Sequence, residues 1–292
     1  MKKITKAVIP AAGLGTRMLP IARTVPKEML PIVDKPAISY LVQEAVDSGI
    51  TDILILTNRG KDTMENYFDY STEYEMHLHN KGKDAMIPEL RKIADCANIT
   101  FMRQKTPMGL GHAVRCARAF TGDEPFVVLY GDDVIFSETK PVCRQLMDAY
   151  EAFGKACVGV QEVPLEWVLK YCTLDAKLLR DNYYDVRDMI EKPKPEQVIT
   201  HLSILGRVLL TPEIYDYLDN LKPGAGGELQ LTDAMREMAQ KEGMTAVNFE
   251  GKRYDMGSKL GFLQANVERA LKDKELGEPF AEYLRTIAQK LN

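Results

Sequence analysis

The chain has 292 residues, of which 45% are hydrophobic and 27% are charged. This composition is typical of a globular protein and excludes collagen-like and disordered chains. No apolar run approaches the roughly 20 residues that span a bilayer. The apolar stretch near the N-terminus, Ala7 to Pro10, is also too short for a signal peptide. We therefore expect a cytoplasmic protein with no membrane partner.

The net charge of −4 provides no overall positive field to attract nucleic acid. A protein of this charge must bind phosphates with a few well-placed cations and backbone amides. The five cysteines form no C-x-x-C pair, which argues against a disulfide framework or a zinc site. They are Cys96, Cys116, Cys143, Cys157 and Cys172.

The first 160 residues alternate short β-branched runs with helical patterns. The predicted strands are 6–10, 52–57, 99–103, 126–130 and 156–160, and the predicted helices are 37–48, 110–120 and 141–153. Residues 61–93 are charged and mostly helical, with breaks near Lys81 and Pro88. The alternation predicts an α/β protein with a parallel, doubly wound sheet.

The second half is less regular. Strands are predicted at 188–191 and 201–210, and a helix is predicted to start at Thr211 as its N-cap, with Pro212 next. A glycine-rich loop at 222–227 leads into a helix at 230–241, and two helices follow after residue 260. The apolar stripe of the last helix needs its own core or a partner. We favour one domain with insertions.

The first motif is the loop Ala11 to Arg17, which follows a predicted strand. Its glycines let backbone amides approach a phosphate or a base, and Arg17 adds a fork of donors that suits phosphate. It lacks the G-K-[ST] of a P-loop and the third glycine of a dinucleotide fingerprint. A glycine turn at this position is as often a purely structural necessity.

The second motif brackets Lys27 and Glu28 between Pro26 and Pro31. The prolines stiffen the backbone, so that Lys27 is held in place as a candidate phosphate ligand. The alternative is a solvated loop charge, which would be the better interpretation if this motif stood alone.

Two acidic motifs are candidates for a metal site. Asp132 and Asp133 directly follow an apolar strand, where open α/β sheets place their ligands. Asp255 lies beside Gly257, far along the chain. Carboxylates at a nucleotide site suit Mg²⁺, which takes one or two of them. One of the adjacent pair is equally compatible with a simple turn aspartate.

A third pair, Glu191 and Lys192, precedes a proline. The glutamate is suited to accept hydrogen bonds from sugar hydroxyls and the lysine to hold a sugar phosphate, although a surface ion pair is the alternative. Together the motifs supply what phosphoryl transfer needs: phosphate donors, a metal carboxylate and hydroxyl acceptors.

In combination these motifs resemble the bacterial UTP–glucose-1-phosphate uridylyltransferases of the sugar-phosphate nucleotidyltransferase family. The resemblance extends from about Lys6 to Leu271. It is carried in order by Val8 to Arg17, Pro26 to Pro31, Gly109 to Val114, Gly131 to Asp133, Glu191 to Pro193, Lys222 to Ala234 and Tyr254 to Gly257.

The resemblance implies a single Rossmann-like nucleotidyltransferase domain, with a mixed, mostly parallel central sheet flanked by helices. Residues 1–160 would form the nucleotide-binding half, 161–260 the sugar-phosphate half, and 261–292 the C-terminal helices, a possible oligomer contact. Members of the family usually assemble into dimers or tetramers, so a homodimer or homotetramer is expected.

The resemblance also implies roles for single residues. Arg17, Lys27 and Lys192 would be catalytic, through the triphosphate and the sugar phosphate. Asp132 and Asp255 would hold Mg²⁺, with Asp132 also counted in the nucleotide site. Gln104 stands at the end of a predicted strand, where it is well placed to read a pyrimidine edge. The residues that hold uracil and ribose would be Ala12, Gly13, Glu28, Gln104 and Gly109.

The implied reaction is an in-line attack by the phosphate oxygen of glucose 1-phosphate on the α-phosphorus of UTP. It yields UDP-glucose and pyrophosphate without a covalent enzyme intermediate. The nucleophile is already an anion, so that no general base is needed and catalysis comes from alignment and charge neutralisation.

Two departures from the family pattern lie on the sugar side, where Glu191 and Lys192 are expected. Cys172 stands where the family has glycine, and Ile199-Thr200-His201 replaces Pro-Ser-Asn. Cys172 and His201 are therefore candidate sugar-site residues. Other sugars, such as galactose, glucuronate or an N-acetylhexosamine, and a weakly active regulatory paralogue remain alternatives. A nicotinamide oxidoreductase is disfavoured, because the second strand ends in Thr57-Asn58-Arg59 without an acid.

Overall fold

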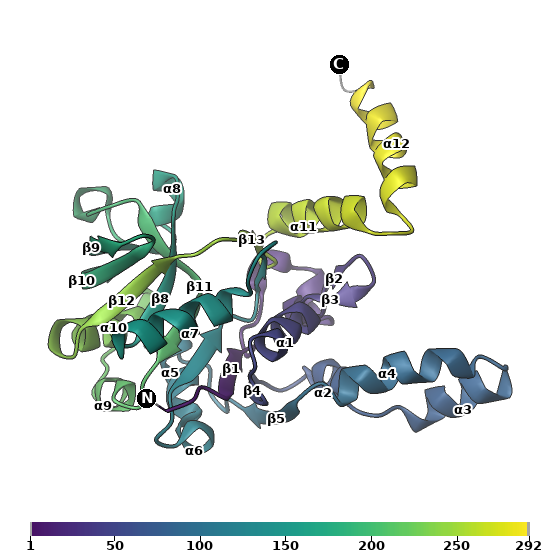
Figure 1. The fold of residues 1–292 in the computed structure, drawn as a ribbon, viewed down its shortest axis with the longest axis horizontal. Coiled ribbons are helices and arrows are strands. Elements are labelled where there is room, and N and C mark those ends of the chain that lie inside the picture. Colours follow the sequence, from purple (N-terminus) through teal and green to yellow (C-terminus); the bar gives the residue numbers. More distant parts are fainter. Residues whose placement is uncertain (1, 291–292) are drawn as a thin grey trace.

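The β-branched runs of the first half form neighbouring strands of one large sheet (Figure 1). The structure is a computed structural model that describes residues 2–290. Four strands pair in parallel, in the order β5-β4-β1-β6. They are β1 (Lys6–Pro10), β4 (Asp52–Thr57), β5 (Asn98–Arg103) and β6 (Phe126–Leu129). The parallel sheet predicted for this half is confirmed.

The second half continues the same sheet in the order β11-β8-β12-β10-β9. These strands are β8 (Cys157–Glu162), β9 (Cys172–Arg180), β10 (Tyr183–Glu191), β11 (Leu202–Leu210) and β12 (Met244–Asn248). β11 is antiparallel to β6 and β8, and β10 is antiparallel to β12 and β9. With β10 and β11 running against the rest, the sheet is mixed and mostly parallel, as the resemblance implied.

Two small ribbons lie beside the main sheet. β7 (Asp133–Phe136) pairs with β13 (Lys252–Asp255) in antiparallel fashion, and β2 (Pro31–Ile32) pairs with β3 (Lys35–Pro36). The β7–β13 ribbon places Asp255 opposite Asp133 in the register. Neither ribbon is predicted by the sequence patterns, because each strand is only two to four residues long.

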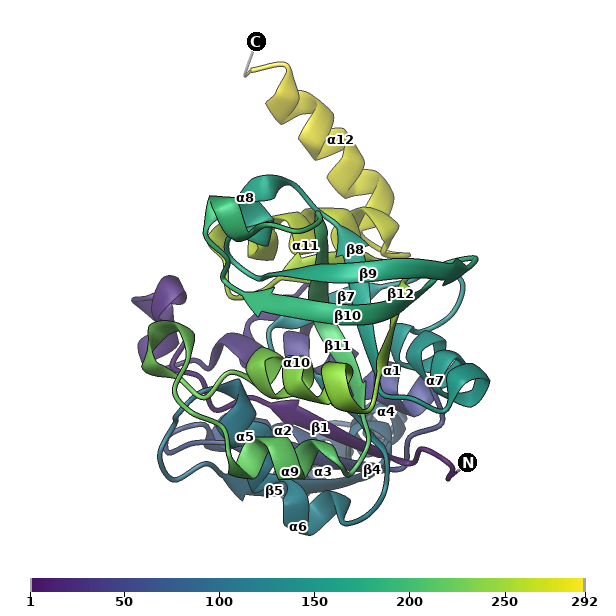
Figure 2. The same cartoon turned by 90° about the vertical axis from the view of Figure 1, so that its left-hand side faces the viewer.

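Helices cover both faces of the sheet, as Figure 2 shows. Ala7 and Ile9 of β1 join one core with α1, α7 and α11, whereas Val8 joins the other with α5, α9 and α10. This alternation is the period of a strand that is buried on both faces. The helices are α1 (Ala37–Asp47), α5 (Leu110–Cys116), α6 (Arg118–Thr121), α7 (Val142–Phe153), α8 (Leu165–Val168), α9 (Ile214–Asp219), α10 (Leu231–Lys241), α11 (Lys259–Lys272) and α12 (Gly277–Ala288).

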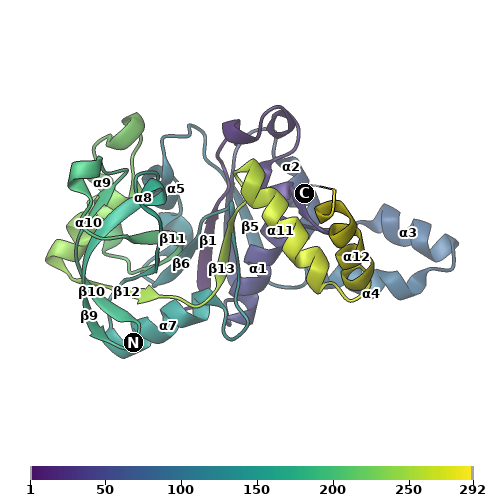
Figure 3. The ribbon, with the colours of Figure 1, turned by 90° about the horizontal axis from the view of Figure 1, so that it is seen from above.

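Two groups of helices extend away from the sheet (Figures 1 and 3). One consists of α2 (Asp62–Phe68), α3 (Thr72–Asn80) and α4 (Ile87–Ala94). It is the predicted charged helical segment, and Pro88 sits in the first turn of α4, where proline is tolerated. The other is α12, which contacts α11. No helix in the described part of the chain meets the length and hydrophobicity needed to span a bilayer.

Two local predictions are wrong. The helix expected over 110–120 is divided at Ala117 into α5 and α6. Thr211 is not a helix N-cap: its carbonyl accepts the N–H of Ile214 in a turn, and α9 begins only at Ile214. In both places a turn bonded through i→i+3 contacts replaces a regular helical turn.

A buried ion pair ties the layers together near the centre of the sheet. The Arg207 side chain of β11 is fully buried and donates to both carboxylate oxygens of Glu44 on α1, at 3.0 and 2.6 Å. It also donates to the Asp133 carbonyl at 2.8 Å, and Glu44 accepts the N–H of Cys143 on α7 at 3.1 Å. One guanidinium thus connects β11, α1, β7 and, through Glu44, α7.

We expect Arg207→Leu to lower the free energy of unfolding by about 3–5 kcal/mol, because it leaves the Glu44 carboxylate buried without its cation. Denaturant unfolding followed by circular dichroism measures this loss. Arg144→Leu is the matched control, since Arg144 pairs with Asp148 and Glu151 at the surface of α7 and should cost far less. Equal losses in the two variants would contradict this account.

Candidate active site

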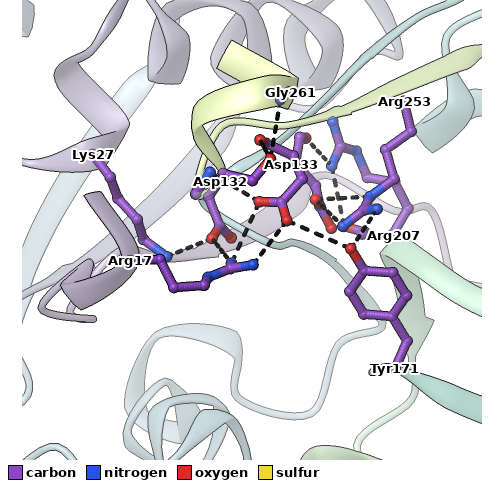
Figure 4. Close-up of polar contacts among 12 residues, drawn as sticks. Arg17, Lys27, Asp132, Asp133, Tyr171, Arg207, Arg253 and Gly261 are labelled. Carbon is purple, nitrogen blue, oxygen red and sulfur yellow. Dashed lines mark hydrogen bonds and ion pairs between the residues drawn. The ribbon is translucent and has the colours of Figure 1, made fainter. Parts of the chain in front are cut away.

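The site is organised by a tight turn at the carboxyl end of β6. The Asp133 N–H donates to the Tyr130 carbonyl at 3.0 Å, and the Tyr130 N–H donates to the Gly206 carbonyl of β11. A Cβ on Gly131 would lie 2.6 Å from the Pro10 carbonyl, so only glycine fits there. The turn directs Asp132 and Asp133 to different sets of cations, as Figure 4 shows.

Asp132 contacts two cations from the loop that follows β1. Lys27 Nζ lies 2.5 Å from Asp132 Oδ2, and Arg17 Nη2 lies 3.7 Å from the same oxygen. Arg17 also donates to Asp255 at 3.0 Å. Although burial alone would raise the pKa of Asp132, Lys27 and Arg17 hold it below its usual range. Four predicted site residues, far apart in sequence, therefore meet at one point.

Asp133 faces the other way and binds Arg253 of β13. Arg253 Nη2 lies 2.6 Å from Asp133 Oδ1, and both side chains are almost fully buried. The guanidinium also stacks on the Tyr171 ring, 4.6 Å from its centroid, and donates to the Tyr171 hydroxyl at 3.0 Å. The sequence reasoning missed Arg253 and Tyr171. The signal that could have found Arg253 is its position two residues before Asp255, the predicted metal ligand. Alternate residues of a strand lie on the same face, so that Arg253 and Asp255 are expected on one side of β13.

Residues that follow β4 hold the backbone of the loop after β1. Lys61 Nζ donates to the Ala11 carbonyl, and Asn58 donates to the Ala12 carbonyl. Lys61 also lies 2.8 Å from Glu28 Oε2, whereas Glu28 Oε1 is buried without a hydrogen-bond partner among residues 2–290. Burial raises the pKa of Glu28 despite Lys61. Sequence reasoning missed Lys61 and Asn58.

Gln104 and Gly109 lie together at the carboxyl end of β5. Gln104 is 4% exposed, and its Nε2 lies 2.6 Å from His112 Nδ1 and 3.5 Å from the Gly109 carbonyl. Gly109 has φ +104°, and an added Cβ would lie 2.7 Å from the Leu229 carbonyl. The loop before α10 therefore packs directly on this corner, which requires glycine.

The expected sugar-side residues lie at the ends of β9 and β10. Glu191 is opposite Cys172 in the strand register, and its Oε2 accepts the Thr232 hydroxyl of α10 at 2.8 Å. Burial raises the pKa of Glu191. Lys192 adopts φ +44°, and its N–H donates to the Tyr171 carbonyl at 2.7 Å.

The two departures from the family pattern occupy different environments. Cys172 is 2% exposed, and its sulfur accepts the N–H of Ile204 on β11 at 3.2 Å. The thiol therefore packs against β11 in the core. His201 is exposed at the start of β11, where its carbonyl accepts the N–H of Val163.

Residues 6–271 match the model of the Nucleotidyl transferase family. The chain belongs to this family. A UTP–glucose-1-phosphate uridylyltransferase of Bacillus subtilis is 49% identical to this nucleotidyltransferase over 99% of both chains, and one from Staphylococcus epidermidis is 48% identical over 98% of this chain and 99% of its own.

Two solved structures share the fold. A UDP-glucose pyrophosphorylase complexed with UDP-glucose superposes with a TM-score of 0.84 at 41% identity, covering 93% of this chain and 100% of its own. The UTP-bound enzyme of Acinetobacter baumannii gives a TM-score of 0.90 at 35% identity, covering 97% and 99%. The predicted nucleotidyltransferase fold is confirmed.

The carboxylates of this nucleotidyltransferase fit a divalent metal that is shared with phosphates. Within residues 2–290 no group of three or more His, Cys, Asp or Glu side chains is placed to hold a metal. Asp132 and Asp255 both contact Arg17 and would supply two carboxylates. Phosphate oxygens and water would complete the coordination, as is usual for Mg²⁺. The family generally uses a divalent metal.

The backbone of Gly257 contacts this charged cluster, and its N–H donates to Asp255 Oδ1 at 2.9 Å. A Cβ at this position would lie 2.6 Å from Asp132 Oδ2, 2.7 Å from Arg17 Nη2 and 3.0 Å from Asp255 Oδ1. We expect Gly257→Ala to fold with unchanged thermal stability, because these are flexible side-chain ends. Nucleotidyl transfer should fall by about 10- to 100-fold as the cluster is displaced. Wild-type turnover in a folded Gly257→Ala protein would refute the close packing proposed here.

Proposed function

We propose that this nucleotidyltransferase transfers uridylyl from UTP to α-D-glucose 1-phosphate, giving UDP-glucose and pyrophosphate. The observation that carries the proposal is the meeting of Arg17, Lys27, Asp132 and Asp255 at the carboxyl end of the parallel strands. Two cations and two carboxylates at this edge suit a nucleoside triphosphate with its metal. The names of the relatives favour UTP and glucose 1-phosphate.

The nucleotide would bind along the loop after β1 and the corner formed by β5 and α5. The backbone of Ala11 and Ala12 is held by the buried residues that follow β4, which supports close contact of Ala12 and the adjoining Gly13 with uracil and ribose. Glu28 offers a buried oxygen without a partner among residues 2–290. Gln104 and Gly109 complete this subsite at the neighbouring strand end.

We assign Mg²⁺ to Asp132 and Asp255, with Asp132 also facing the nucleotide. When bound, the metal would supply positive charge that offsets the repulsion between the triphosphate and the incoming phosphate. Arg17 and Lys27 would bind the β- and γ-phosphates and stabilise the departing pyrophosphate. Burial alone would lower the pKa of Lys27, but Asp132 raises it, so that the lysine remains a cation at neutral pH.

The sugar phosphate would bind between α10 and the β9–β10 hairpin. Glu191 would accept hydrogen bonds from sugar hydroxyls, with Thr232 fixing one of its oxygens. Lys192, held by its backbone bond to Tyr171, would bind the phosphate. Cys172 and His201 flank this region, and the contact of the Cys172 sulfur with β11 supports a pocket that still admits glucose.

The reaction would proceed by in-line displacement at the α-phosphorus. A phosphate oxygen of the sugar phosphate forms the new P–O bond as the bond to the β-phosphate oxygen breaks, and pyrophosphate leaves with that electron pair. Lys192 would align the nucleophile, while Lys27 and Arg17 would neutralise the leaving group. No general base and no covalent enzyme intermediate are required. UTP is a cytoplasmic metabolite, which fits the expected location.

A panel of sugar 1-phosphates tests this proposal. With UTP and Mg²⁺, we expect glucose 1-phosphate to give the highest kcat/KM, measured by pyrophosphate release, and removal of divalent metal with EDTA to abolish turnover. Galactose, glucuronate and N-acetylglucosamine 1-phosphates should be at least 10-fold poorer. Equal or better turnover with another sugar would replace glucose. UTP binding without product from any sugar would indicate a regulatory protein instead.

Two matched substitutions distinguish a specific role of Asp132 in the site from the loss of an acidic side chain elsewhere on the protein. Asp132→Asn should reduce kcat by about 10²- to 10³-fold, a loss of the size found when a single electrostatic contact is removed from an active site. Asp123→Asn should leave kcat unchanged, because Asp123 is exposed in the loop before β6, at the opposite end of the same strand. Full metal-dependent activity of Asp132→Asn would contradict the proposed site.

We further propose that the chain acts as one unit in a homodimer or homotetramer formed through 261–292. An apolar groove of about 540 Å³ lies between α11 and α12. Leu263 and Tyr283 on its wall are 56% and 59% exposed. An apolar surface of this kind beside α12, the helix that extends away from the sheet at this end, favours a second copy of the chain as its cover.

Light scattering after size-exclusion chromatography tests this assembly. We expect a dimer or tetramer for the wild type and monomers for Leu263→Asp, which places a charge in the apolar groove. Leu178→Asp is the matched control, since Leu178 is similarly exposed on the β9–β10 hairpin. A wild-type monomer, or a Leu263→Asp protein with unchanged mass, would rule out this interface.

A further inference from the structure

His112 lies behind the residue expected to read the nucleobase. It is the third residue of α5, and its Nδ1 is 2.6 Å from Gln104 Nε2. The amide nitrogen is only a donor, so that Nδ1 must be the acceptor and the imidazole must be neutral. The Gly109 carbonyl, a second acceptor, lies 3.5 Å from the same nitrogen. Two acceptors therefore hold the nitrogen end of the Gln104 amide.

The oxygen end of the amide is left available. Gln104 Oε1 has no hydrogen-bond partner within residues 2–290. Gln104 as a residue is only 4% exposed. Two side-chain oxygens, Glu28 Oε1 and Thr57 Oγ1, are fully buried without a hydrogen-bond partner among the described residues, but Gln104 Oε1 is not one of them. The oxygen consequently reaches open space at the strand end, where it presents an acceptor.

We infer that His112 is a positioning residue that fixes the Gln104 amide with its oxygen toward the nucleobase and thereby selects uracil over cytosine. The inference rests on the uracil subsite of the proposed function. Uracil carries a hydrogen on ring nitrogen N3, whereas cytosine has a lone pair there. An oxygen directed at N3 accepts a hydrogen bond from uracil and repels cytosine. With the amide reversed, the preference would be reversed as well.

The surroundings of His112 keep it neutral. Burial and Arg115 on the next turn lower its pKa from the ordinary value of 6.5. Arg115 itself pairs with Asp219 at the end of α9, at 2.8 Å. Cys116 Sγ lies 3.8 Å from His112 Nε2, and burial raises the pKa of this thiol, so that it carries no charge. Protonation of His112 at acidic pH would remove the acceptor and release the amide of Gln104.

The test compares binding of UTP and CTP, each with Mg²⁺, to the wild type, His112→Leu and His112→Asn by titration calorimetry. His112→Leu removes the acceptor, and we expect the UTP/CTP affinity ratio to fall by roughly 3- to 10-fold, the contribution of one hydrogen bond. His112→Asn places an amide oxygen at the position of Nδ1 and should retain most of the ratio. In turnover, His112→Leu should raise KM for UTP and spare kcat.

Two further readouts distinguish positioning from mere packing. UTP affinity of the wild type should decline as the pH falls through the pKa of His112, below 6.5. His112→Asn should show only the change due to the UTP phosphates themselves. On a Gln104→Ala background, His112→Leu should have no additional effect on the ratio.

If the wild type favours UTP and a folded His112→Leu variant keeps the same UTP/CTP affinity ratio, the inference about His112 is overturned while the proposed uracil subsite stands. A wild type that binds UTP no better than CTP would overturn the proposed uracil subsite and the inference with it. Thermal unfolding of each variant establishes that it is folded before its affinities are compared.

Discussion

The site depends on one electrostatic constraint: two adjacent carboxylates stand at the end of a fully buried strand. A buried charge is tolerated only when it is paired. Asp133 meets this requirement through Arg253, and the backbone of the same turn is held by Arg207, which Glu44 neutralises. Because Asp133 is tied inward, its neighbour Asp132 is left facing the two cations of the loop after β1. The orientation of Asp132, the proposed metal ligand, is therefore set by contacts on the opposite side of the turn.

The strand that reverses direction beside β6 contributes to holding these carboxylates. β11 runs antiparallel to β6 and brings Gly206 against the turn, where a Cβ would lie 2.6 Å from the Asp133 Cβ. Gly206 has φ +76°, a conformation that glycine adopts without strain. The side chain of the next residue, Arg207, then donates a hydrogen bond to the Asp133 carbonyl in the turn. The antiparallel strand thus joins the two halves of the sheet at the position where the carboxylates must be held.

Sequence patterns predicted the parts of the molecule that depend on neighbours along the chain. The strands 6–10 and 52–57 appear with the predicted bounds because each is a short β-branched run that is buried on both faces. The parallel order and the carboxyl-end location of Asp132 follow from that alternation. The clustering of Asp255 with Arg17 spans 238 residues, so that no local pattern encodes it and only the resemblance indicated it. Lys61 carried no signal, since a lysine in a loop is ordinary. His112 lies within the resembling motif Gly109 to Val114, but nothing in that motif indicated its contact with Gln104, which arises from the packing of α5 against the end of β5.

The proposed function places recognition of the base and recognition of the sugar at two different corners of the site. Residues at the base corner come from the ends of β1 and β5 and from α5, and they are held by Lys61, Asn58 and His112. Residues at the sugar corner come from the β9–β10 hairpin and α10, where Thr232 and the strand register hold Glu191. The charged cluster at Asp132 lies between them and contacts the loop after β1 on one side and β13 on the other. The two corners are joined through α10, since the loop before this helix packs on Gly109 while its Thr232 holds Glu191. The hydrogen bonds of Cys172 nevertheless run to β11, so that this departure on the proposed sugar side leaves the supports of the base corner intact. Specificity for the sugar is thereby free to diverge within a fixed uridylyl-transfer chemistry.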